Sequence, residues 1–274
     1  MLGKLLKHEF QATGRVMWVI YAAMGILSVF ANISFRFDGM GNPEQNRVIG
    51  ALMVLLVVLW VLSLVIGGVA TIVLIVKRFH QNLLTDEGYL MFTLPGTVHH
   101  LVLAKIIVAA VWLMATFAAI ALCCLIAMFR SEFLLDFSEA IGEIFQYMTA
   151  YYALNGMAVV IELLIMVFIF CAESVLQFYS AMSIGYGFTS HKALWSVVFY
   201  FIQSTVLQVV GTVLLSLIMN VAEERFLDLW QAFDLSAVKT WHMSMLGACV
   251  IELMLAAVFY FLTTWNLKNR LNLS

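Results

Sequence analysis

The sequence predicts an all-α integral membrane protein with six transmembrane helices. Apolar residues make up 64% of its 274 residues and charged residues only 11%, whereas a soluble domain is about half apolar and about a quarter charged. A soluble fold of this length has too little interior to bury so much apolar surface. The apolar residues also form continuous runs close to or longer than the roughly 20 residues that a helix needs to cross a bilayer. Strands of a membrane barrel would alternate over about ten residues, so helices are favoured.

Six apolar runs are the predicted spans. Several of them exceed the minimum length, which allows tilt or extension beyond the bilayer. With their connections they make one predicted transmembrane domain, residues 16–274, whose longest cytoplasmic connection is 77–100. The predicted spans lie near residues 17–35, 48–76, 101–129, 147–175, 193–220 and 243–265.

The first fifteen residues predict a separate amphipathic helix. Apolar side chains recur at helical spacing on one face and polar ones take the other, which is typical of a helix lying in the membrane interface. A cytoplasmic tail that only sets the topology is the alternative. No small-residue cleavage site follows the first apolar run, so this run is predicted to be retained as a span. The two faces are Leu2, Leu5, Leu6 and Phe10 against Lys4, Lys7, His8 and Gln11.

The basic residues predict that both termini are cytoplasmic. Cytoplasmic connections carry an excess of Lys and Arg, and this orientation places nine of them inside and five outside. The inner set is Lys4, Lys7, Arg15, Lys77, Arg78, Lys105, Lys192, Lys268 and Arg270. The outer set is Arg36, Arg47, Arg130, Arg225 and Lys239.

The cytoplasmic connection 77–100 predicts a short helix with an apolar surface. Thr85 is a candidate N-cap, and Asp86 and Glu87 would then lie in the first turn, where the helix dipole favours acids. Pro95-Gly96 ends the segment. An exposed apolar patch in water usually marks a protein-binding site; folding back onto the bilayer is the alternative. The patch comprises Tyr89, Leu90, Met91, Phe92 and Leu94.

Motifs of catalysis are missing from the sequence. Gly-x-x-x-x-Gly-Lys-Ser/Thr, His-Glu-x-x-His and Gly-x-Ser-x-Gly do not occur, which argues against nucleotide hydrolysis, zinc proteolysis and serine hydrolysis in this chain. We therefore expect no catalytic residue, no metal site and no bound cofactor. The cysteines lie within apolar runs and are expected to be free thiols: Cys123, Cys124, Cys171 and Cys249.

Polar residues inside the spans are candidate functional groups. Glu162 lies near the middle of the fourth predicted span and Glu252 in the outer part of the sixth. Carboxylates at this depth are costly and often functional, although a protonated acid that hydrogen-bonds a neighbouring helix is the alternative. A polar stripe in the fifth span either lines a path or joins helices; it consists of Ser204, Gln208 and Thr212.

The segment from Arg78 to Pro95, Arg-Phe-His-Gln-Asn-Leu-Leu-Thr-Asp-Glu-Gly-Tyr-Leu-Met-Phe-Thr-Leu-Pro, resembles the first cytoplasmic loop of ABC-2-type permeases. These are the membrane subunits of bacterial ATP-binding cassette (ABC) transporters. The N-terminal Met-Leu-Gly-Lys-Leu-Leu-Lys-His-Glu-Phe is similar to their amphipathic N-terminal helix, and Ser183 to Lys192 is similar to their second cytoplasmic loop.

The resemblance implies a multi-pass exporter of the bacterial cytoplasmic membrane. Permeases of this family have six spans, pair with a second copy or a paralogue, and dock on a separate ATPase subunit that binds ATP and Mg. Their path between the second and fifth spans would give the polar stripe a role. The docking residues of the implied coupling helix are Thr85, Glu87, Tyr89, Met91, Phe92 and Leu94.

Two other functions stay open at this point. One is a proton-coupled secondary transporter that uses Glu162. The other is a non-transporting membrane scaffold that recruits a cytoplasmic partner through the patch between Tyr89 and Leu94. The transported substrate, whether peptide, lipid or drug, is not indicated by the sequence.

Overall fold

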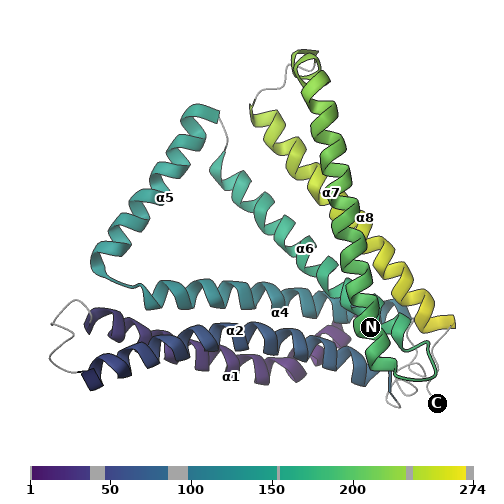
Figure 1. The fold of residues 1–274 in the computed structure, drawn as a ribbon, viewed down its shortest axis with the longest axis horizontal. Helices are drawn as coiled ribbons and strands as arrows, with labels where there is room; N and C mark the ends of the chain where they lie inside the picture. Colours follow the sequence, from purple (N-terminus) through teal and green to yellow (C-terminus); the bar gives the residue numbers. More distant parts are fainter. Residues whose placement is uncertain (1, 38–46, 86–97, 153–154, 233–236, 270–274) are drawn as a thin grey trace. The chain divides into compact units, whose positions relative to one another are not determined.

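A computed structural model describes residues 2–37, 47–85, 98–152, 155–232 and 237–269 (Figure 1). Within these ranges the chain forms α-helices and no strand, which confirms the predicted all-α class. Six of the helices are long and apolar enough to cross a membrane; α5 is the exception. The helices are α1 (Leu2–Phe37), α2 (Arg47–Leu83), α4 (Val98–Ala127), α5 (Ser131–Tyr152), α6 (Gly156–Gly185), α7 (Lys192–Ala232) and α8 (Ala237–Asn269).

Packing divides the chain into two compact units. The first unit comprises Met1–Arg78 and Leu103–Ile144, and the second comprises Phe79–Val102 and Phe145–Ser274. The last residues of α2 and the first residues of α4 therefore belong to the second unit.

In the first unit, polar contacts join α1 to α4. The Lys105 ammonium on α4 pairs with the Glu9 carboxylate on α1 at 2.7 Å, with both side chains largely buried. One turn further along α1, the indole of Trp112 donates to the Thr13 hydroxyl at 2.8 Å. Such contacts hold membrane helices together because lipid offers a polar group no other partner. Lys105, which the topology prediction placed in a cytoplasmic segment, is therefore a packing residue of α4.

Helix α1 runs without a break through the predicted boundary at residues 15 and 16. Thr13 and Met17, on either side of this boundary, are both buried. The amphipathic N-terminal residues thus continue directly into the first span. Their position relative to the membrane surface stays a prediction, as does the cytoplasmic location of both termini.

Helix α6 begins later than the predicted fourth span. Residues 147–152 belong to α5, and α6 starts at Gly156 after Asn155, whose side chain accepts a hydrogen bond from the Met157 amide at 3.1 Å. An asparagine at this position caps a new helix. The apolar run continues through the turn, so hydropathy alone does not show the break. At its other end, α6 extends to Gly185, beyond the predicted end at residue 175.

Helix α5 covers most of the predicted outer connection between the third and fourth spans, residues 130–146. Its acids recur at three- and four-residue steps on one face, and its large apolar residues follow the same period on the opposite face. The described acids are Asp136, Glu139 and Glu143, and the opposing apolar residues include Phe137, Ile141, Ile144 and Met148. Helix α5 is therefore amphipathic, unlike the six apolar helices.

In the second unit, α6 packs against both α7 and α8. The hairpin between α6 and α7 is tight, because a Cβ atom on Gly185 would come within 2.4 Å of the Ser196 backbone nitrogen. Rings stack on both sides of α6: Phe178 lies on Tyr200 of α7, with centroids 4.5 Å apart, and Tyr179 lies on Phe79 of α2. Helix α6 is thus the central packing element of this unit.

Candidate functional site: the cytoplasmic connection and the α6–α8 seam

Most of the predicted docking residues lie outside the described part of the chain: Glu87, Tyr89, Met91, Phe92 and Leu94. Thr85 is described, and its hydroxyl donates to the Gln81 carbonyl, which closes the last turn of α2. The structure therefore leaves the docking roles as predictions. It does show how the two ends of this connection are held.

The first end of the connection is anchored to α6 and to the turn that follows it. Phe79 is fully buried and stacks on Tyr179 with ring centroids 3.9 Å apart. His80 Nε2 and the Tyr186 hydroxyl are hydrogen-bonded at 2.5 Å. Burial raises the pKa of Tyr186 above its ordinary value of 10.0, so the hydroxyl keeps its proton at neutral pH and donates to His80.

The second end is anchored to α8. His99 Nδ1 lies 2.8 Å from the Tyr260 hydroxyl, and Lys268 Nζ lies 3.2 Å from His99 Nε2. Because an ammonium only donates, Nε2 accepts from Lys268 and the ring proton of Nδ1 is donated to Tyr260. The segment between Thr85 and Val98 thus leaves from a contact with α6 and returns to a contact with α8.

These anchors bring four helix ends to one end of the second unit. The carboxyl ends of α2, α6 and α8 meet there with the amino end of α4. This is the arrangement expected when the second, fourth and sixth spans end, and the third begins, on the same side of a membrane. The alternating order of six spans is consistent with it.

A seam between α6 and α8 holds ionisable residues. The Glu162 carboxylate and His242 Nδ1 are 2.5 Å apart, and both side chains are partly exposed. Because α6 begins at Gly156, Glu162 lies less than two turns from the start of this helix. The prediction had placed it near the middle of the fourth span. Its partner His242 was not among the predicted site residues.

Glu173 takes the central position that was expected of Glu162. Its side chain is 5% exposed, and Oε1 has no hydrogen-bond partner within the described residues. Glu162 pairs with His242 near the start of both helices, so α6 and α8, which pack against each other, have their first turns at the same level.

The predicted polar stripe of α7 divides into two parts. Ser204 accepts a hydrogen bond from Gln177 Nε2 on α6 at 2.9 Å, and a neighbouring contact runs from the Ser180 hydroxyl to Gln203 Oε1 at 3.1 Å. Ser204 therefore joins two helices. Gln208 and Thr212 are exposed, and the Thr212 hydroxyl donates to the Gln208 carbonyl within the helix.

Sequence reasoning missed Glu173 and His242 for identifiable reasons. The predicted fourth span ended at residue 175, which placed Glu173 at the membrane edge. His242 lay just before the predicted start of the sixth span. The signal that was available is the spacing of Glu162 and Glu173, since eleven residues are close to three full helical turns and place both on one face.

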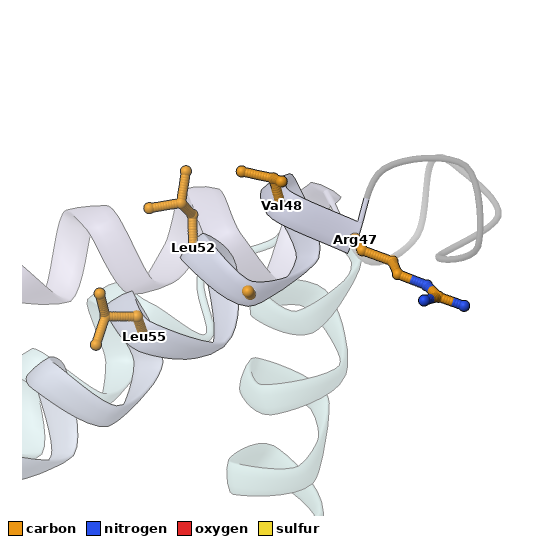
Figure 2. A pocket seen from close by; sticks show the side chains of 5 residues that line it. Arg47, Val48, Leu52 and Leu55 are labelled. Atoms are coloured by element: carbon orange, nitrogen blue, oxygen red, sulfur yellow. The ribbon is translucent and has the colours of Figure 1, made fainter.

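Other features of the described chain offer no site. A shallow hollow of about 410 Å³ lies along the first turns of α2 (Figure 2). Figure 2 shows Arg47, Val48, Leu52 and Leu55 among the residues that line it. Within the described residues, no three His, Cys, Asp or Glu side chains gather as metal ligands would.

Comparison with protein-family models, with curated proteins and with solved structures found no match to the chain.

Proposed function

We propose that the chain is the membrane-spanning permease subunit of a bacterial ABC exporter, powered by a separate ATPase subunit. One observation supports this function best: the connection that carries the predicted coupling helix is anchored at one end to α6 and at the other to α8. A partner that moves this connection would move two spans with it. The sequence resemblance of Arg78 to Pro95 supplies the nature of the partner.

The proposed mechanism is alternating access driven from the cytoplasmic side. ATP binding closes the two ATPase subunits and displaces the coupling helices that dock on them. The Phe79–Tyr179 stack passes this displacement to α6, and the His99–Tyr260 contact passes it to α8. A second permease, as a copy or a paralogue, completes the path. Driving such a change requires that the partner contact the two states differently.

Docking by residues 85–94 is tested with a Tyr89→Ala, Phe92→Ala double variant of the full chain. The variant is expressed in its native cells, solubilised in detergent and purified, and the co-purifying ATPase is quantified. We expect recovery of the ATPase to fall at least tenfold while the variant still inserts. Phe145→Ala, which removes an exposed aromatic residue from α5, is the matched control and should leave recovery unchanged. Normal recovery with the double variant would contradict the proposal.

The α6–α8 seam favours a second candidate function, proton-coupled secondary transport. Its specific support is the Glu162–His242 pair, since carboxylates and histidines within spans are the usual elements of proton relays. This function needs no ATPase. Transport would follow an imposed proton gradient and would be abolished in Glu162→Gln. A chain that purifies without any ATPase and shows this dependence would replace the permease proposal.

A further inference from the structure

The second end of the cytoplasmic connection is held by a contact whose geometry determines its protonation state. Lys268 Nζ on α8 lies 3.2 Å from His99 Nε2 on α4, and His99 Nδ1 lies 2.8 Å from the Tyr260 hydroxyl. An ammonium has protons to donate and no lone pair with which to accept. Nε2 therefore carries a lone pair, and the His99 imidazole is neutral in this arrangement.

A proton on His99 would change one of these two contacts. It comes from water as H⁺ and bonds to the lone pair of Nε2, so the step needs no other reactant. Nδ1 already holds a proton and keeps its contact with Tyr260, but Nε2 becomes a donor that faces the ammonium of Lys268. Two cations at this separation repel each other, so the His99–Lys268 contact exists only while His99 is neutral.

The positions of the two residues on their helices add to this effect. His99 is in the first turn of α4, where the positive end of the helix dipole disfavours a cation. Lys268 is in the last turn of α8, where the negative end favours one. Lys268 is exposed and His99 is partly exposed, so the ammonium can move into water. Protonation of His99 is therefore expected to break the contact.

The ionisable groups around this contact supply no opposite charge. The described ionisable residues at this end of the second unit come from α2, α4, the turn after α6, the start of α7 and the end of α8, and none of them is an acid. Besides His99 and Lys268, they are His80, His100, Tyr186, His191, Lys192 and Tyr260. Further along α4, Lys105 is already paired with Glu9 of α1. A protonated His99 thus gains no described anionic partner.

The first end of the connection responds differently to acid. Burial lowers the pKa of His80 below its ordinary value of 6.5, so His80 stays neutral to a lower pH than an ordinary histidine. It continues to accept the hydrogen bond from the Tyr186 hydroxyl. We therefore expect the anchor to α6 to persist under mild acid.

We propose that the His99–Lys268 contact is a pH-sensitive latch, which fastens the second end of the connection to α8 while His99 is neutral and opens when His99 gains a proton. With the latch open, this end keeps its contact with Tyr260 and loses the one with Lys268. In the proposed orientation, acidification of the cytoplasm loosens the connection that the ATPase would move. This regulatory role rests on the proposed permease function, whereas the latch itself does not.

Hydrogen–deuterium exchange of the full chain in phosphatidylcholine vesicles tests the latch. Exchange is recorded by mass spectrometry at about pH 8 and about pH 5.5, which bracket the ordinary titration of histidine. Each observed rate is compared with the intrinsic rate at the same pH, so the ratio measures the protection that the fold provides. We expect protection in the last turn of α8 to fall at least threefold at the lower pH. Protection in the turn after α6, next to Tyr186, should change less than twofold.

Three variants assign the response to the latch. His99→Gln has no ring to protonate, and Lys268→Met has no ammonium for a protonated His99 to repel, so protection in each should be the same at both pH values within twofold. His100→Gln, the same substitution one residue along, is the matched control and should respond as the unaltered chain does. A threefold fall that persists in Lys268→Met, or an unaltered chain that shows no fall, would overturn the proposal.

The exposed position of Lys268 covers the case in which His99→Gln fails to fold, because Lys268→Met replaces a side chain at the surface and tests the same contact. The exchange measurement involves no ATPase, so the latch and the permease function fail or survive separately. A pH response that requires both His99 and Lys268, in a chain that recovers no ATPase, would establish the latch and contradict the permease function.

Discussion

Phe79 at the end of α2 and Tyr179 on α6 stack with ring centroids 3.9 Å apart and planes inclined by 12°. Phe79 lies only a few residues before the predicted coupling helix, and both rings are fully buried. The stack therefore joins a segment expected to contact a partner to a helix that packs on both α7 and α8. In the proposed mechanism it is the first rigid step between the cytoplasm and the spans.

Replacing Phe79 by alanine should destabilise the second unit and weaken this step. Loss of a buried aromatic side chain typically costs about 3–5 kcal/mol, of which about 0.5–1.5 kcal/mol reflects the ring–ring interaction. Unfolding of Phe79→Ala, Tyr179→Ala and the double variant in detergent measures the second part as a coupling energy. Strictly additive effects of the two substitutions would show that the stack contributes nothing of its own. Phe79→Leu should retain most of the stability.

The buried pair of Lys105 and Glu9 predicts an asymmetric response to mutation. Either single substitution removes the ion-pair partner of a largely buried charge between α1 and α4, and breaking a buried pair in this way typically costs about 3–5 kcal/mol. The double variant Lys105→Met, Glu9→Leu removes both charges together and should recover much of this loss. Lys4→Ala, which replaces an exposed lysine of α1, is the control and should change stability by less than about 0.5 kcal/mol. Equal losses in the single and double variants would refute the pairing.

Gly67 and its neighbour Gly68 provide a matched pair on α2. A Cβ atom on Gly67 would lie 2.4 Å from the Met24 sulfur, whereas one on Gly68 would meet no atom within 4 Å. Gly67→Ala should therefore destabilise the chain by about 1–3 kcal/mol, and Met24→Ala should relieve the clash. Gly68→Ala should be neutral or slightly stabilising, because alanine is the better helix former. Thermal unfolding in detergent checks all three, and equal effects at the two glycines would contradict the close approach of α1.

The two faces of α5 should differ in their access to water. Helix α5 begins four residues after α4 ends and stops four residues before α6 begins, so both of its ends are close in sequence to ends of predicted spans. We expect it to lie along the membrane surface with its apolar face towards lipid. Cysteines placed at Glu139 and Ile141, in a chain whose own cysteines are replaced by alanine, are treated with a membrane-impermeant maleimide on cells. We expect Glu139→Cys to react at least tenfold faster than Ile141→Cys. Equal rates would argue against an interfacial α5.

The helical class and the number of spans could be predicted because both follow from features of the sequence alone. Run length and continuous apolarity decide whether a segment crosses the bilayer, and neither depends on how helices pack. The break at Asn155 was missed because it is made by one capping side chain within an apolar run. Helix α6 therefore begins and ends about ten residues later than the predicted fourth span. Glu162 lies near the start of this helix, and Glu173 lies near its middle.

Pairings between helices were beyond the reach of the sequence. The sequence alone suggests that Lys105 is a topology signal, whereas the structure places Glu9 of α1 beside it. The sequence alone suggests that His242 is an outer polar residue, whereas the structure pairs it with Glu162 of α6. Each pairing depends on the rotation and register of two helices relative to each other. Those quantities are determined by packing over the whole contact, and no short motif encodes them.

Purification of the chain from its native cells, in mild detergent and followed by mass spectrometry of the associated proteins, tests the proposed permease function. We predict a soluble protein with a Gly-x-x-x-x-Gly-Lys-Ser/Thr loop in stoichiometric amount, and its loss when Tyr89 and Phe92 are both replaced by alanine. A chain that is recovered alone, or only with copies of itself, under conditions that preserve known membrane complexes would contradict the permease function.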